Sequence, residues 1–226
     1  MKNTNKSKFA MRFFAGLLAL IGLAYVYAYI NSHTDFASWL GFSPYLYETD
    51  DIALQQKYSS QSANAIQWSQ LLPPNEKQIL QQYQQQQAST PTEFADNILL
   101  SLRASVDEEY SAAMNSINSV DTFDGKAVSI AGFIVPIDYA EDKSLSNIFI
   151  VPYYGACLHF PPPPPNQIIF AQLGKGFTEF ELTQAYRLRG IMRRGLFEDP
   201  LGTSAYILDV VSIEPFADNP DDFRQH

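Results

Sequence analysis

An uninterrupted apolar run near the N-terminus, residues 13–30, most constrains how this chain can fold. It holds 18 residues without a charge, is rich in Leu, Ala and Gly, and ends in Tyr25, Tyr27 and Tyr29. A helix of that length spans about 27 Å, close to the hydrocarbon thickness of a bilayer. Tyrosines are also typical of the membrane–water interface. The run therefore predicts a single transmembrane helix that anchors the protein in a membrane.

The charges on either side of the run predict its orientation. Lys2, Lys6, Lys8 and Arg12 lie before it or at its start, and the next basic residue is Lys57. By the positive-inside rule, the N-terminus lies in the cytoplasm and the rest of the chain on the other side of the membrane. A cleaved signal peptide would give the same compartment, and a buried core helix is the third interpretation.

The charge balance and the cysteine count restrict the partners of the remaining body. Apart from the four basic residues before and at the start of the apolar run, the chain carries 11 basic and 24 acidic residues. Such a body repels nucleic acid and anionic lipid headgroups, so we expect no nucleic-acid partner. Cys157 is the single cysteine, which excludes an intramolecular disulfide. An exported protein must bury such a thiol, use it as a ligand or pair it with another chain.

The pattern along the chain divides it into five segments. Thr90 to Glu93 form a capping box with proline at the first helical position. Apolar residues then recur every four positions and predict an amphipathic helix of about 25 residues, which we expect to pack on the sheet that follows. The segments are residues 1–30, the cytoplasmic N-terminus and membrane anchor; 31–64, a juxtamembrane connector; 65–122, a helical segment; 123–217, a β-domain; and 218–226, a flexible acidic tail.

The β-domain is expected to contain five short strands. They are predicted at Ala127–Ile137, Leu145–Pro152, Ile168–Leu173, Ala185–Arg193 and Ala205–Ile213. Gly132 and Gly190 lie in mid-strand, where a small barrel needs tight coiling or a bulge. The expected fold class is α+β: a transmembrane helix, a helical segment and a small five-stranded barrel like those that bind oligonucleotides and oligosaccharides (OB-like). A sandwich or an open meander is the alternative.

Residues 152–167 contain the side chains that are best suited to bind a metal ion or to act as a nucleophile. Cys157 and His159 are two positions apart, so in an extended chain both side chains point to one side. A thiolate and an imidazole together are half of a site for Zn²⁺ or copper. The same pair could be a nucleophile and its base, or a buried thiol beside a structural histidine. Two further candidate metal ligands would have to come from carboxylates or water.

The rest of this segment predicts an interaction surface. Five consecutive prolines, 161–165, favour a stiff polyproline II rod. Such a rod flanked by aromatic residues is typical of a docking element. The candidate interaction residues are Tyr153, Tyr154, Phe160, Pro161, Pro163, Pro165, Asn166 and Gln167.

The run from Val151 to Phe160, followed by five prolines and Asn166-Gln167, resembles the signature of a bacterial envelope family known only as a domain of unknown function. The strand from Gly125 to Pro136 and the Trp-x-x-Leu-x-Pro element at residues 68–73 resemble that family too. The resemblance covers about residues 65–216 and leaves the helical, Gln-rich part at 75–120 as a departure. It implies an exported, lipoprotein-like protein of the periplasm, associated with ABC-type transport systems and with metal supply.

Three functional hypotheses follow from these patterns. The first is a non-enzymatic accessory protein on the periplasmic side of the inner membrane, which binds Zn or Cu or a component of an envelope transporter through Cys157, His159 and the proline segment. The second is a pure protein–protein interaction module, in which the Cys–His pair is structural. The third is a thiol-dependent enzyme of the cell envelope, which requires a Cys157 with a lowered pKa.

Overall fold

The computed structural model divides the chain into two compact units, Met1–Pro44 and Tyr45–His226. The structure describes residues 45–83, 90–156, 162–178 and 180–220, all in the second unit. The predicted transmembrane helix and the last residues of the predicted acidic tail lie outside the described residues. Within those four ranges, the helices are too short or too polar to cross a membrane.

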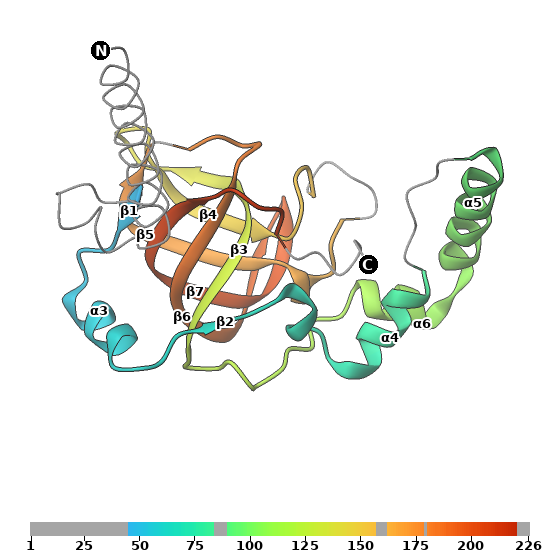
Figure 1. The fold of residues 1–226 in the computed structure, drawn as a ribbon, viewed down its shortest axis with the longest axis horizontal. Coiled ribbons are helices and arrows are strands. Elements are labelled where there is room, and N and C mark those ends of the chain that lie inside the picture. The colour runs from blue at the N-terminus through green and yellow to red at the C-terminus, as the bar shows by residue number, and fades with distance from the viewer. Residues whose placement is uncertain (1–44, 84–89, 157–161, 179, 221–226) are drawn as a thin grey trace, which may run out of the picture. The chain divides into compact units, whose positions relative to one another are not determined.

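The described elements combine one sheet with four short α-helices (Figure 1). The strands are β1 (Tyr47–Glu48), β2 (Asn64–Ala65), β3 (Ala127–Tyr139), β4 (Leu145–Val151), β5 (Ile169–Phe177), β6 (Ala185–Asp199) and β7 (Gly202–Phe216). The helices are α3 (Ile52–Ser59), α4 (Pro74–Gln82), α5 (Pro91–Val106) and α6 (Glu108–Met114), with 3-10 turns η1 (Trp68–Gln70) and η2 (Pro165–Gln167). The predicted α+β class is confirmed.

The five long strands form a closed circuit of pairs. Strand β3 pairs with β4 and with β6, and β4 pairs with β5, in each case antiparallel. Strand β5 pairs in parallel with β7, and β7 returns antiparallel to β6. Each strand of the circuit therefore has a partner on both sides. The short strands β1 and β2 add to β7 and β3, so the segment from Tyr45, expected to be a connector, contributes to the sheet.

All five predicted strands are present, and four of them are longer than predicted, β3 by only two residues. Strand β5 continues through Gly174 to Phe177, because Leu145 of β4 pairs with Phe177. Strands β6 and β7 extend into a long hairpin, in which Asp199 pairs with Gly202. These extensions depend on a neighbouring strand, and the short-range pattern of the sequence does not show it.

The two mid-strand glycines lie where the backbones approach most closely. A Cβ atom on Gly190 would lie 2.2 Å from the carbonyl oxygen of Asp209, at a shift in the β6–β7 register. A Cβ atom on Gly132 would lie 2.8 Å from the carbonyl oxygen of Val151. Both positions therefore need glycine for space, as the predicted tight coiling requires.

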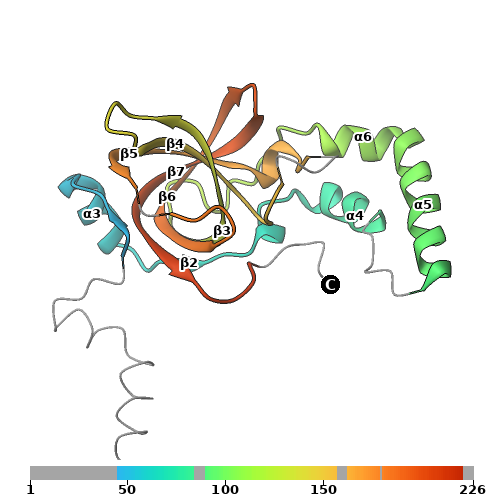
Figure 2. The same ribbon diagram turned by 90° about the horizontal axis from the view of Figure 1, so that it is seen from above.

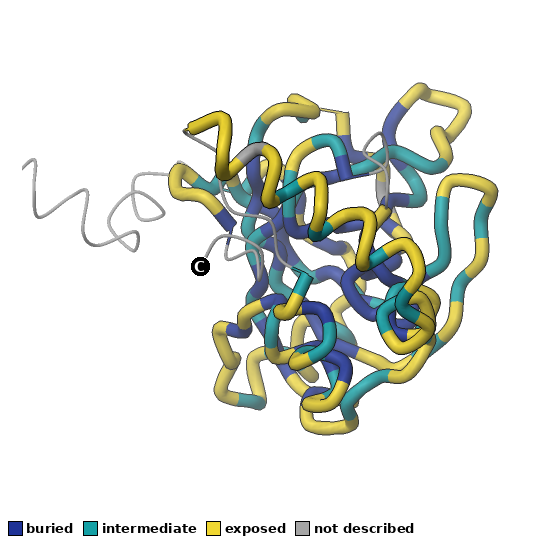
Figure 3. Tube along the Cα trace, turned by 90° about the vertical axis from the view of Figure 1, so that its right-hand side faces the viewer, coloured by how far each residue is buried: buried dark blue, intermediate teal, exposed yellow. Residues whose placement is uncertain are grey.

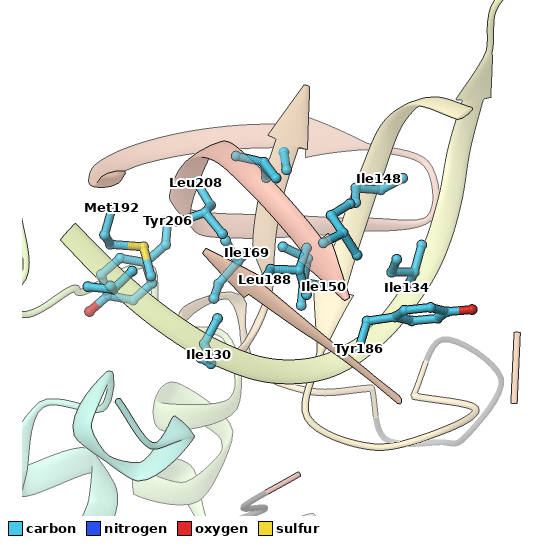
Figure 4. Close-up of a cluster of buried hydrophobic side chains, with 14 of the residues drawn as sticks. Ile130, Ile134, Ile148, Ile150, Ile169, Tyr186, Leu188, Met192, Tyr206 and Leu208 are labelled. Carbon is cyan, nitrogen blue, oxygen red and sulfur yellow. The ribbon is translucent and has the colours of Figure 1, made fainter. Parts of the chain in front are cut away.

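The main core lies inside the strand circuit. Figure 4 shows inward-pointing side chains from all five strands, mostly Ile and Leu with Met192, Tyr186 and Tyr206. Trp68 and Leu71 from the η1 region belong to the same buried cluster. The helical segment thereby contributes directly to the core of the sheet through its first few residues.

The predicted 25-residue helix is two helices, α5 and α6, separated at Asp107. The Asp107 carboxylate accepts a hydrogen bond from the Tyr110 backbone N–H at 2.8 Å and so caps the start of α6. Helix α6 lies beside α4, whereas α5 projects from them (Figure 2). The expectation that the long helix packs on the sheet is wrong for α5, most of whose large apolar side chains are exposed.

Candidate functional site around the proline segment

The predicted site residues divide into a central group and two flanks. Cys157, His159, Phe160 and Pro161 lie outside the described residues. On the first flank, Tyr153 is half-buried and Tyr154 is 52% exposed. On the second flank, Pro163, Asn166 and Gln167 are buried and Pro165 is half-buried.

The first flank leaves the end of β4 and is fixed by apolar packing. Ala156 is fully buried in a second apolar cluster, on the opposite face of the strands from the main core. Gly155 adopts a φ of +74°, which a residue with a side chain rarely adopts. Tyr154 packs its ring 6.1 Å from that of Phe133, and both rings remain partly accessible. The first flank thus ends at a buried residue, Ala156, and has the exposed Tyr154 two positions before it.

The second flank is fixed by hydrogen bonds rather than by apolar contacts alone. The Asn166 side-chain amide donates to the Glu76 carboxylate at 2.7 Å and to the Asn118 carbonyl at 3.1 Å. The Gln167 side-chain amide donates to the Trp68 carbonyl at 2.9 Å. These contacts join the end of the proline segment to α4, 90 residues earlier in the chain, and to the η1 turn, 99 residues earlier.

Glu76 is the centre of this buried polar network. Besides Asn166, its carboxylate accepts hydrogen bonds from the Ser116 hydroxyl at 2.7 Å and the Asn118 amide at 2.8 Å. A buried carboxylate is stable only when such donors replace water. The sequence pattern does not distinguish Glu76, because an acidic residue near the start of a helix is also what a solvent-exposed helix carries.

A second buried polar group, the hydroxyl of Tyr206, is hydrogen-bonded to the Trp-x-x-Leu-x-Pro element. Its hydroxyl donates to the Leu71 carbonyl at 2.8 Å and accepts from the Val120 N–H at 2.7 Å. Burial raises the pKa of Tyr206 to about 12, and the hydrogen bond from Val120 only partly opposes that effect. The Trp68 indole N–H donates to the Ala131 carbonyl on β3 at 2.7 Å. The two parts of the chain that resemble the family motifs, the Trp-x-x-Leu-x-Pro element and β3, are therefore hydrogen-bonded to each other, and Tyr206 joins the first of them to β7.

Some of the prolines of this segment are buried in the fold. Pro164 has φ −63° and ψ 155°, as expected for polyproline II. Pro162 is exposed, whereas Pro163 and Pro164 are buried. The described prolines thus include buried ones as well as an exposed one.

Charged groups on the outer face of β6 and β7 are paired with each other. Arg189 forms an ion pair with Glu214 at 2.7 Å. Arg193 donates two hydrogen bonds to the two carboxylate oxygens of Asp209, both at 2.7 Å. Because the carboxylates neutralise them, these arginines do not form a site for an anionic ligand.

The described residues offer no ready-made metal cage. Among them, no group of three or more His, Cys, Asp or Glu side chains is placed to hold a metal ion.

Comparison with known protein families shows to which family the chain is related. Residues 68–215 match the model of DUF3299, a family described as proteins of unknown function. This chain belongs to the DUF3299 family. The match begins at Trp68 and ends at Pro215, so it contains the strand circuit except the last residue of β7, together with both flanks of the proline segment.

A solved structure gives a second comparison. The chain is similar to a DUF3299 family protein from Pseudomonas aeruginosa PAO1, with 28% identity and a TM-score of 0.49. The similarity covers 70% of this chain and 98% of that one. No curated protein matches the chain.

Proposed function

We propose that this protein is a non-enzymatic accessory protein of the bacterial envelope that acts by binding a partner through residues 153–167. In this proposal residues 13–30 anchor it in the inner membrane and the body lies in the periplasm. The observation that carries the proposal is the fixation of both flanks, by buried Ala156 on one side and by Asn166 and Gln167 on the other. Fixed ends lower the entropy that the intervening residues lose when they bind.

We infer that the scaffold is an OB-like barrel. The circuit β3-β4-β5-β7-β6, with its parallel β5–β7 pair, supports this interpretation. OB barrels bind oligonucleotides and oligosaccharides on the face of their second and third strands. Here the ring of Phe197, from the β6–β7 hairpin, stacks on Phe170 of β5 at 3.6 Å between ring centres. That face is occupied by the protein's own aromatic side chains, which favours a different binding surface.

A protein partner is the form of the proposal that the described residues favour. Tyr154 exposes half of its surface beside the half-buried Phe133 and near the fixed start of the segment. Exposed aromatic side chains on a rigid base are typical of interaction hot spots. A component of an envelope transporter is the partner we propose, on the basis of the family resemblance.

The test of this form is affinity capture from membranes with the full-length chain. We expect Tyr154→Ala to reduce the yield of the captured partner about tenfold, as loss of a hot-spot tyrosine does. Tyr139→Ala is the matched control, because Tyr139 is equally exposed at the far end of β3. Equal capture by wild type and Tyr154→Ala would contradict a role of this surface.

A transition-metal ion is the second candidate, because Cys157 and His159 combine a soft thiolate donor with an imidazole in the same segment. The full-length protein in detergent should bind Zn²⁺ or Cu⁺ with a dissociation constant below about 10 μM. Cys157→Ala and His159→Ala should each weaken binding, and His226→Ala serves as the control. Binding that both substitutions leave unchanged would refute this form and leave the protein-partner form intact.

A further inference from the structure

Helix α5 presents an apolar face that the described residues do not cover. Ile98, Leu99, Leu102 and Val106 are 47%, 53%, 60% and 80% exposed. In Figure 3 the helix crosses the front of the view and is exposed along most of its length. These positions follow the spacing of one helix face. Several adjoining apolar side chains on one face are typical of an interaction site.

The charges on the edge of this face have a particular arrangement. Asp96 and Arg103 are both exposed and lie seven residues apart, which is about two helical turns. They therefore lie on the same edge of the apolar face, with opposite signs at the two ends. The midpoint between them, near position 100, is also the midpoint between Ile98 and Leu102.

We propose that α5 pairs with α5 of a second copy of this chain, antiparallel across a twofold axis near position 100. A twofold axis between antiparallel helices keeps each edge of one helix beside the same edge of the other. Asp96 then lies opposite Arg103 of the second copy, and the reverse pair forms at the other end. In the same register Ile98 packs against Leu102 of the second copy, and the two helix dipoles oppose each other.

The size of this face indicates how tight the association is. A stable dimer buries about 800 Å² on each partner, which is more than four partly exposed side chains supply. The dimer is therefore weak and depends on protein concentration. This inference is independent of the proposed function, because α5 and residues 153–167 are different surfaces.

Charge reversal tests the antiparallel register directly. The full-length chain in detergent is studied by sedimentation at protein concentrations from about 1 to 200 μM. We expect wild type to dimerise, and Asp96→Arg and Arg103→Asp to weaken the dimer about tenfold each, because each variant places like charges opposite one another. A mixture of the two variants should restore the wild-type affinity, because both interchain pairs are then of opposite sign.

Two further variants complete the test. Leu102→Glu should abolish the dimer without loss of helix content, because Leu102 is largely exposed. Glu141→Arg changes the net charge as Asp96→Arg does but lies in the exposed β3–β4 turn, so it should leave the dimer unchanged. A wild-type monomer at all concentrations would overturn the proposal. So would a dimer that survives Leu102→Glu, since another surface would then form it, or mixed variants that fail to associate.

Discussion

At the residue scale, buried polar groups connect the family motifs to one another. Glu76 receives three donors from segments that are far apart in the chain. Tyr206 joins Leu71 to Val120 through one hydroxyl. A buried polar group with its partners in place holds one arrangement of the chain, because any other leaves a donor or acceptor unpaired. These two side chains therefore fix the geometry on which the proline segment rests.

Glu76→Ala should lower the free energy of unfolding by about 3 kcal/mol, because the donors of Ser116, Asn118 and Asn166 lose their acceptor in a buried place. Urea unfolding measures the change. Glu141→Ala, at an exposed turn, should stay within about 0.5 kcal/mol of wild type. A Glu76→Ala variant as stable as wild type would show that water replaces the carboxylate there.

Tyr206→Phe should reduce stability by about 1–2 kcal/mol near neutral pH, since both hydrogen bonds of the hydroxyl are lost. The folded pKa of Tyr206 is raised from 10.0 to about 12, so its contribution is complete below pH 10 and declines as the pH rises toward 12. The difference between wild type and Tyr206→Phe should accordingly narrow by about 1 kcal/mol by pH 11. Urea unfolding at a series of pH values measures this, and a constant difference would contradict it.

At the scale of the elements, the close contacts of the strands decide which residues are allowed. Gly190→Ala places a Cβ atom against the Asp209 carbonyl and should cost about 1–3 kcal/mol in unfolding free energy. Gly174→Ala is the control, because a Cβ atom there meets nothing within 4 Å. Thermal unfolding of both variants tests the prediction. Equal stability of the two would mean that the sheet relaxes around position 190.

The elements also show where the sequence pattern was sufficient. Alternating or continuous apolar side chains predicted all five strands, because side chains on the two faces of a strand meet different surroundings. The ends of β5, β6 and β7 were missed, since pairing with a neighbour extends them beyond the pattern. Asp107 interrupts the predicted long helix because its carboxylate caps a new one. That capping role is local, and a search for N-cap residues within the helix could have found it.

At the scale of the whole molecule, the compact unit is larger than the family match. Strand β1 and helix α3 precede residue 68, yet Tyr47 is buried and its hydroxyl accepts a hydrogen bond from the Gly174 N–H at 3.2 Å. Strand β1 also adds to β7 at Ile213. The segment before the family match thus pairs with the part of β7, at Ser212 and Ile213, that β5 does not reach.

A chain of residues 61–226 should therefore be less stable than one of residues 45–226, by about 3 kcal/mol or more, because it loses the buried Tyr47 and the β1–β7 pairing. Urea unfolding of the two chains measures the difference. Tyr47→Ala in the longer chain should account for most of it. If both chains unfold at the same urea concentration, residues 45–60 make no contribution to the fold.

The sequence by itself determined the family, the α+β class and the five strands. Each of these depends on short-range periodicity or on a run of adjacent residues. Only the tertiary structure placed Asn166 and Gln167 against Glu76 and Trp68, and left the apolar face of α5 exposed. The reason is physical: a glutamate becomes a buried anchor, or an apolar helix face stays accessible, according to which distant segments pack beside it, and residue type and spacing do not carry that information.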